Sequence, residues 1–362
     1  MKRYLKFIYG IMMAVLLLGC DGNKEMPAAT GDGTESGGIA EERVTEAEEA
    51  RKDVFAMDTY MTVTAYGDRA QEAVDAAEAE IERLDSLLST GQSTSEVARI
   101  NADGGGTLSA DTKYLLERSL ELYESTEGAF DVAIYPVMKA WGFADGNFNV
   151  PSAETLQELS LLTDASKIDY DAENISVSFK QEGMEIDFGG IAKGYTSAKI
   201  MDIFREYGVI SGCVSLGGNV QVYGTKMDGT LWRVAVQSPE GGDNYLGILS
   251  TSDRAVITSG GYERNFEQDG VTYHHIIDPA TGYPANNGLT SVTIVSADGT
   301  LADGLSTSLF VMGKGKAVEY WRKNSDNFDM ILFADDGNLY VSEGIKDNFA
   351  SDYDMEIITR ER

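Results

Sequence analysis

Short runs with strand-like patterns most constrain how this chain can fold. The run MTVTAY at 61–66 alternates apolar and polar residues, and comparable runs recur along the chain. We expect strands over 61–66, 175–179, 184–188, 232–237, 255–259, 291–296 and 330–334. These strands outnumber the expected helices and are grouped unevenly. The sequence therefore predicts an α+β fold, with mixed or antiparallel sheets and packed helices, rather than a doubly wound parallel sheet.

Apolar residues at helical spacing mark four further segments. They predict helices over 69–88, 111–125, 192–207 and 303–313. Glycine readily adopts the left-handed conformation that ends a helix, so we expect Gly208 to close the third helix and Gly313 or Gly315 the fourth.

The first twenty residues have the organisation of a secretory leader. Three cations within the first six residues precede an apolar run over 7–18, which is too short for an ordinary membrane-spanning helix. The run ends in LLGC at 17–20, which resembles a bacterial lipobox. We predict a signal peptide over 1–19, lipidation at Cys20, and an extracytoplasmic protein anchored to the bacterial cell membrane. A cleaved signal with an incidental cysteine is the alternative.

The segment after the leader does not look like part of a packed core. Residues 21–53 include no aromatic side chain and are rich in Gly, Ala, Thr, Ser and Glu, so burial cannot offset the entropy of ordering. We predict a flexible acidic tether over 20–53, in which 41–52 could form a transient helix, and a folded domain over 54–362. The charged tail beyond Gly344 ends in a possible edge strand.

Composition limits the partners and the metals. The chain has 59 acidic residues against 29 Lys and Arg, a formal net charge of −30. Nucleic-acid affinity comes largely from cationic side chains that displace counterions, so we expect no nucleic-acid binding. Two cysteines are too few for a disulfide framework or a Cys-rich zinc site, and any metal must be held mainly by oxygen. We expect Cys213 to be a buried apolar residue.

Glycine pairs follow expected strands at three places, in DFGGIAKGY (187–195), SLGGN (215–219) and TSGGYERN (258–265). The first opens a helix, so its backbone N–H groups could face an anion, and Lys193 would add positive charge. The spacing differs from that of a P-loop. One glycine pair is more often only a tight turn, but three suggest a ligand with a long polar spine, such as a dinucleotide.

Two further segments carry candidate catalytic and metal-binding side chains. His274 and His275, the only histidines, begin HHIIDPATGYP, and neighbours on a strand point to opposite faces, so only one can enter a given site. They could also be strand histidines without a role. Asp303 and Thr307 are one helical turn apart, and a carboxylate with a hydroxyl suits Mg²⁺ when other oxygens complete the shell. An Asp near a helix start is more often a cap.

Taken in order, these motifs resemble the FAD:protein FMN transferases, the ApbE-type flavin transferases. The resemblance covers about Met57 to Gly313 and implies an ApbE-like flavin transferase fold. The matching segments are MDTYMTV (57–63), SEVARIN (95–101), GAFDVAIYPVMKAWGF (128–143), DFGGIAKGY, SLGGN, TSGGYERN, HHIIDPATGYP and ADGLST (302–307).

The resemblance implies a specific reaction. Such enzymes take FAD as a substrate, break its pyrophosphate, attach FMN through a phosphoester bond to a threonine of a partner protein, and release AMP. The family's acceptors are exported or membrane-associated flavoproteins, including subunits of Nqr-type and Rnf-type redox complexes and small FMN-binding domains. The predicted lipoprotein leader would place this chain on the same side of the membrane.

The resemblance also implies residue roles. His275 would deprotonate the acceptor threonine, while Asp303, Thr307 and a backbone carbonyl near Gly190 would bind Mg²⁺. The FAD-binding positions would be Met57, Ala129, Phe130, Asp131, Asp187, Lys193 and the backbone around Ile277, with Phe130 alternatively an ordinary core residue. Gly91 stands where many relatives carry an aromatic residue able to stack on the isoalloxazine. We therefore expect weaker FAD binding or cover by another side chain.

Two other functions fit the same residues. With water as acceptor, the site would be an FAD pyrophosphatase that releases FMN and AMP. A lipid-tethered flavin-binding protein is the non-enzymatic alternative, although a binder has no evident need for His275, Asp303 and Thr307 together.

Overall fold

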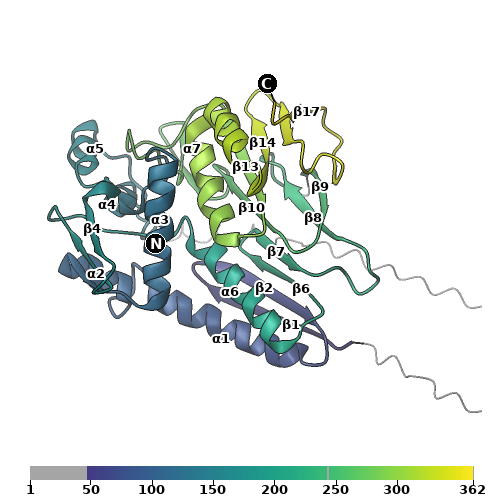
Figure 1. The fold of residues 1–362 in the computed structure, drawn as a ribbon. Coiled ribbons are helices and arrows are strands. Elements are labelled where there is room, and N and C mark those ends of the chain that lie inside the picture. Colours follow the sequence, from purple (N-terminus) through teal and green to yellow (C-terminus); the bar gives the residue numbers. More distant parts are fainter. Residues whose placement is uncertain (1–46, 243, 362) are drawn as a thin grey trace, which may run out of the picture. The chain divides into compact units, whose positions relative to one another are not determined.

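The computed structural model describes residues 47–242 and 244–361 (Figure 1). The predicted signal peptide, the lipidation site at Cys20 and most of the predicted tether lie outside these ranges. Within them, no helix combines the length and the apolar character needed to cross a membrane.

The largest element is a nine-stranded sheet of order β1-β2-β6-β7-β10-β13-β14-β15-β17. Only the pair β15 and β17 is parallel, and the other neighbours are antiparallel. This topology confirms the α+β prediction. The strands are β1 (Glu49–Ala56), β2 (Thr59–Tyr66), β6 (Ser211–Leu216), β7 (Asn219–Tyr223), β10 (Ala255–Gly260), β13 (Leu289–Ser296), β14 (Phe328–Ala334), β15 (Leu339–Ser342) and β17 (Met355–Ile358).

Three helices cover one face of this sheet (Figure 1): α1 (Ala70–Leu88), α6 (Ala192–Tyr207) and α7 (Gly299–Asn324). A three-stranded sheet of β8 (Trp232–Gln237), β9 (Tyr245–Thr251) and β16 (Phe349–Ala350) packs on the other. Because side chains alternate along a strand, Val214 of β6 faces the helices and Cys213 faces the second sheet. Cys213 is buried, as predicted, and burial raises the pKa of its thiol to about 12.

The remaining elements form a smaller helical layer and two small sheets. The helices are α2 (Glu96–Asp103), α3 (Ala110–Ser125), α4 (Tyr135–Trp141) and α5 (Ala153–Ser160), with short 3₁₀ turns η1 (Val132–Ile134) and η2 (Ala165–Lys167). The strands are β3 (Gly105–Thr107), β4 (Ile168–Asp171) and β5 (Ser176–Phe179), and the separate hairpin β11 (Asn265–Gln268) and β12 (Val271–His274). This hairpin leads directly into His275.

The predicted strand over 184–188 is wrong, and the structure shows why. The backbone C=O and N–H of Ile186 bond to the side-chain amide of Asn101, both at 2.8 Å. The N–H of Asp187 donates to the carbonyl of Val132 at 2.9 Å. A helix side chain and a loop thus satisfy backbone groups that a neighbouring strand would otherwise take.

The folded part begins earlier than predicted. Strand β1 starts at Glu49 and pairs with β2 along its whole length, whereas the domain boundary was expected near 54. Most side chains from 49 to 53 are charged and lie at the surface of this edge strand, so composition alone resembles a tether. Lys52 pairs with Asp75 and Glu78 of α1, each at 2.7 Å. The described part of 41–52 is therefore largely strand and not a transient helix.

Helix α7 also continues past its predicted end. Gly313 takes a left-handed φ of 75°, as a helix-ending glycine would, but the chain re-enters the helix and reaches Asn324. The side-chain amide of Asn287 donates to the carbonyls of Phe310 and Val311, each at 2.7 Å. This amide supplies partners for carbonyls that the kink leaves free.

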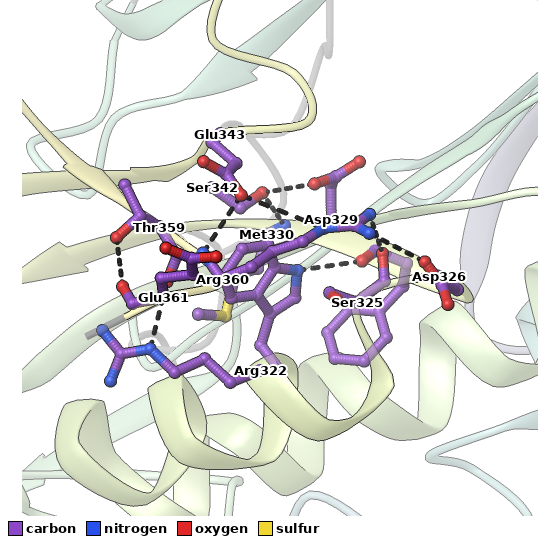
Figure 2. Close-up of polar contacts among 12 residues, drawn as sticks. Arg322, Ser325, Asp326, Asp329, Met330, Ser342, Glu343, Thr359, Arg360 and Glu361 are labelled. Carbon is purple, nitrogen blue, oxygen red and sulfur yellow. Dashed lines mark hydrogen bonds and ion pairs between the residues drawn. The ribbon is translucent and has the colours of Figure 1, made fainter.

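The far end of α7 is fixed to the C-terminal segment by two arginines (Figure 2). Arg360 donates to Asp326 at 2.8 Å and to the carbonyl of Ser325 at 3.0 Å, while Arg322 donates to the carbonyl of Thr359 at 3.0 Å. Arg360 therefore caps the helix C-terminus, where carbonyls lack helical partners. The tail contains the expected edge strand, β17.

Candidate active site

Helices α6 and α7 cross closely at their first turns, and this crossing assembles the site. A Cβ on Gly194 would lie 2.2 Å from the carbonyl oxygen of Gly299 and 2.6 Å from Cβ of Asp303, so only glycine permits the approach. Lys193 precedes Gly194, and Thr307 lies one turn beyond Asp303. Two predicted motifs that are 109 residues apart, measured between Gly194 and Asp303, thus share one site.

Asp303 is a buried carboxylate held by uncharged donors. Asp303 is only 4% exposed. Oδ2 accepts from the backbone N–H of Gly194 at 2.8 Å, and Oδ1 accepts from the side-chain amide of Asn219 at 2.9 Å. Burial raises the pKa of this carboxyl, and the charge of Lys193 opposes that rise. Within the described residues no Lys or Arg forms an ion pair with Asp303, so its charge has no direct partner.

Thr307 and Gly190 lie beside each other near Asp303. The hydroxyl of Thr307 lies 3.3 Å from that of Ser259, which also bonds Ser306 at 2.7 Å. A Cβ on Gly190 would lie 3.9 Å from Thr307 Oγ1 and 3.1 Å from the ring of Phe130, which is buried. Phe130 thus packs as a core side chain against Gly190, the alternative role noted for it.

These oxygens suit a hard cation. A carboxylate, a hydroxyl and a nearby backbone carbonyl are the ligand types that Mg²⁺ prefers, with waters or phosphate oxygens completing the shell. Residues 47–242 and 244–361 contain no group of three or more His, Cys, Asp or Glu side chains placed to hold a metal. The predicted ligand set of Asp303, Thr307 and Gly190 contains only one carboxylate, so such a group is not expected. Within the described residues, Asp303 has no Lys or Arg paired with it, which suits a carboxylate that binds a metal cation.

The two histidines differ in which ring nitrogens are free. Nδ1 of His275 lies 3.1 Å from the carbonyl of Arg264 and must donate to it, because a carbonyl only accepts. Nε2 of His275 therefore carries the lone pair, and burial lowers the pKa of this imidazole to about 3, which keeps it neutral at pH 7. In His274, Nε2 donates to the carbonyl of Ala285 at 3.0 Å and Nδ1 accepts from the backbone N–H of Ile276 at 3.3 Å, so both ring nitrogens have a partner.

Lys193 is the electrostatic centre of the site. Its charge acts on Asp187, Glu263, His275 and Asp303, yet within the described residues it forms no ion pair or hydrogen bond through its ammonium. The ammonium of Lys193 is thus available to an anionic ligand.

Three other predicted FAD-binding residues border this cluster. Asp187 accepts from the N–H of Gly189 at 2.9 Å, and burial raises the pKa of its carboxyl against the charges of Lys193 and Arg264. Met57 is fixed by its N–H to Asp85 at 2.9 Å, and its sulfur lies 3.9 Å from the hydroxyl of Thr196 on α6. Ala129 is partly buried beside Phe130.

Two predicted positions are occupied by local structure. The carboxylate of Asp131 accepts from the N–H groups of Ala133 at 2.8 Å and Ala165 at 3.3 Å, and burial raises its pKa to about 6. It caps a 3₁₀ turn and is not brought to Lys193. Ile277 is buried and forms a single β-bridge with Pro284, so its contribution to a ligand site would come from the backbone.

Comparison with known proteins decides the family. The model of the ApbE family matches residues 57–332. The chain belongs to the ApbE family. It is 33% identical over 311 residues to the FAD:protein FMN transferase of Treponema pallidum, covering 80% of this chain and 85% of that protein.

Solved structures give the same result for the fold. The ApbE protein of Thermotoga maritima has a TM-score of 0.78 and 32% identity, covering 83% of this chain and 99% of that one. The flavin transferase ApbE of Vibrio cholerae has a TM-score of 0.75 and 28% identity, covering 83% and 99%. The ApbE-like fold and the resemblance found in the sequence are both confirmed.

Several residues of this ApbE-family site were not foreseen as functional. Asn101, Asn219, Ser259, Glu263 and Arg264 lie inside the quoted motifs, but in SLGGN and TSGGYERN the glycine pairs, and not these side chains, were the predicted feature. Arg264 presents its carbonyl to His275 and donates its guanidinium to the carbonyl of Phe143. A buried amide or hydroxyl next to a tight turn is the signal that could have found Asn219 and Ser259.

A cavity of about 470 Å³ lies away from these residues. It is lined by Arg118, Asp298, Leu305, Tyr320 and Asn327, among others, and includes none of the predicted site residues. Arg118 there is already paired with Glu121 at 2.6 Å and with Asp298 at 3.2 Å. We place the chemistry at the crossing of α6 and α7, where charge is uncompensated, and not in this cavity.

Proposed function

We propose that this ApbE-family chain is an Mg²⁺-dependent FAD:protein FMN transferase that joins FMN to a threonine of a partner flavoprotein and releases AMP. Family membership supports the reaction, since curated relatives such as that of Treponema pallidum are named for it. One observation carries the assignment to this site. Lys193, whose ammonium has no partner among the described residues, acts electrostatically on both His275 and the buried Asp303 near the crossing of α6 and α7.

His275 is suited to receive the proton of the acceptor hydroxyl. In the transfer, threonine Oγ bonds to the FMN phosphorus, the bond to the bridging oxygen breaks, and AMP leaves with that oxygen. The hydrogen bond from Nδ1 to Arg264 directs the lone pair of His275 to Nε2, where the proton would be taken up. A bound diphosphate would add negative charge, which favours the protonated imidazole and would raise the pKa of His275.

The remaining residues bind and orient the diphosphate. Lys193 would neutralise part of its charge, because its ammonium has no partner within residues 47–242 and 244–361. Asp303, Thr307 and the carbonyl of Gly190 would hold Mg²⁺ through oxygen. When bound, Mg²⁺ would neutralise phosphate charge and stabilise the leaving AMP.

The acceptor and the location follow from the same proposal. The partner would be an exported or membrane-bound flavoprotein, such as an Rnf-type or Nqr-type subunit or an FMN-binding domain, that exposes the target threonine. The leader and the LLGC segment at 17–20 support an enzyme anchored through Cys20 on the outer side of the cell membrane.

Intact-mass analysis of a candidate acceptor tests the proposal. After incubation with enzyme, FAD and Mg²⁺, the acceptor should gain the mass of one FMN, with AMP released in equal amount. An acceptor with alanine at the target threonine should gain none, and EDTA should stop the reaction. His275→Ala should still bind FAD but lose transfer. Release of free FMN without acceptor would indicate a pyrophosphatase, and FAD binding without turnover would indicate a flavin-binding protein.

A further inference from the structure

Asn219 is the side chain that holds Asp303 from the sheet. It is 3% exposed, and within the described residues no other side chain donates a hydrogen bond to Asp303. Its position is set by Gly217 and Gly218, whose φ angles of 59° and 100° form the turn between β6 and β7. The glycine pair of SLGGN, expected to face a ligand with its backbone, instead places Asn219 at the start of β7.

The two hydrogen bonds on Asp303 fix the plane of its carboxylate. The amide of Asn219 bonds one oxygen at 2.9 Å and the N–H of Gly194 bonds the other at 2.8 Å, so rotation of the carboxylate breaks at least one of them. A carboxylate has about four lone-pair directions, so one remains for a cation beside these two bonds and the contact with the backbone N–H of Lys193. Without the amide of Asn219, one buried carboxylate oxygen of Asp303 would lack its hydrogen-bond donor, which costs free energy. The carboxylate of Asp303 could then rotate.

We infer that Asn219 is a positioning residue that sets the affinity of the site for Mg²⁺ by fixing the Asp303 carboxylate. The inference rests on the Mg²⁺ dependence in the proposed function. Groups that orient metal ligands typically contribute 10–100-fold to metal affinity, and a buried amide bonded to a ligand oxygen is such a group. Asn219 touches neither the reacting atoms nor the diphosphate in this account.

Gln221 offers a matched control two residues along the same strand. It is also buried, and its side-chain oxygen accepts from the hydroxyl of Ser197 at 2.6 Å, without a hydrogen bond to Asp303. Replacing either amide by leucine removes a buried polar group of similar size from β7. A difference in Mg²⁺ binding between the two variants therefore reports the contact with Asp303 and not a general loss of packing.

The experiment is a calorimetric titration of Mg²⁺ into full-length protein loaded with FAD and free of acceptor. Asn219→Leu should weaken Mg²⁺ binding about 10–100-fold, whereas Gln221→Leu should change it by less than about twofold. In transfer assays the apparent KM for Mg²⁺ should rise by the same factor for Asn219→Leu, with kcat at saturating Mg²⁺ much less affected. Asn219→Ala should show a smaller loss, because water can enter and donate.

Several outcomes would overturn the inference. Unchanged Mg²⁺ affinity in folded Asn219→Leu would do so, and if that variant does not fold, unchanged affinity in Asn219→Ala is equally decisive. An equal loss in Gln221→Leu would assign the effect to packing. Wild-type protein that binds no Mg²⁺ beside FAD overturns it too. Failure of the proposed transfer is separate: wild-type protein that binds Mg²⁺ but yields free FMN and AMP refutes transfer and leaves the Asn219 titration valid.

Discussion

The carboxylates near the two ends of helix α7 differ in burial and in the charge of their partners. Near its start, Asp303 is buried and accepts hydrogen bonds from uncharged groups, among them the backbone N–H of Gly194 and the side-chain amide of Asn219. Beyond its end, Asp326 has 89% of its side chain exposed and pairs with Arg360 at 2.8 Å (Figure 2). An exposed ion pair contributes little stability, whereas a buried charge without a counter-charge is unfavourable.

This difference distinguishes the candidate active site from a purely structural contact on the same helix. At the far end, Arg360 pairs with Asp326 and Arg322 donates to the carbonyl of Thr359. The near end retains an unfavourable charge beside a lysine that also has no partner. Such an arrangement becomes favourable when a cation and an anionic ligand bind, so uncompensated burial indicates where function lies.

The largest expected effect comes from removing one carboxylate at each end. Asp303→Ala should lower the rate of FMN transfer by at least about 100-fold, because it removes the one carboxylate of the proposed Mg²⁺ site. Asp326→Ala should leave the rate unchanged within about twofold, as expected of an exposed surface group. Mass spectrometry of the acceptor over time gives both rates. Equal losses in the two variants would contradict the contrast between the ends of α7.

The next effect concerns the close approach of α6 to α7. Gly194→Ala places a methyl group 2.2 Å from the carbonyl oxygen of Gly299, so the helices must separate. We expect a loss of about 1–3 kcal/mol in the free energy of unfolding, together with a drop in transfer, since Asp303 moves with α7. Gly315→Ala is the control, because its added Cβ meets nothing within 4 Å, and it should stabilise α7 by about 0.5–1 kcal/mol. Urea unfolding measures both, and an unaffected Gly194→Ala would refute the tight crossing.

A third prediction concerns His275 and pH. Burial lowers its pKa from 6.5 to about 3, so the folded state resists protonation, and this contribution to stability is full above about pH 6.5 and lost as pH falls toward 3. His275→Gln has no imidazole to protonate, so it does not lose stability in this way as the pH falls. Its free energy of unfolding, relative to wild type, should rise by up to about 1.4 kcal/mol for each pH unit below 6.5. Urea titrations at pH 7, 6, 5 and 4 measure the difference, and a constant difference would mean that His275 is not desolvated.

The smallest effect is expected at the far end of α7. Arg360→Ala removes the bonds to Asp326 and Ser325 and should cost about 1 kcal/mol of stability, with transfer unchanged. Arg205→Ala, which breaks an exposed pair with Asp202 on α6, should cost at most about 0.5 kcal/mol. Thermal unfolding compares the two variants. If Arg360→Ala also lowered the rate of transfer, the contacts of Arg360 would affect the candidate site. The contrast between the two ends of α7 would then not hold.

Much of the fold was readable from contiguous residues. Helices over 69–88 and 192–207 agree with α1 and α6 because their apolar residues repeat at helical spacing. The run 184–188 has a strand pattern, but its backbone bonds to Asn101 and Val132, which no local pattern reveals. The strand from Glu49 was missed for the opposite reason, since charged side chains at a sheet edge resemble a tether.

The candidate site divides in a similar way. The residue types and their order pointed to His275, Lys193, Asp303 and Thr307, and the structure brings these near one another. Preference for His275 over His274 came from resemblance alone, whereas the geometry adds a physical difference, since only His275 keeps a free ring nitrogen. Asp131 is the reverse case, a motif position whose carboxylate turns out to cap its own segment.

The sequence by itself determined the α+β pattern and the motif order that identifies the ApbE family, and it limited the predicted metal ligands to oxygen and the candidate bases to one histidine pair. Each of these is written in residues a few positions apart, where spacing reports helix or strand directly. Only the tertiary structure decided that Gly194 lets α6 meet α7, that Asn219 holds Asp303, and that the ammonium of Lys193 has no partner among the residues described. Those facts depend on side chains from distant segments meeting during packing, and such contacts have no period along the chain.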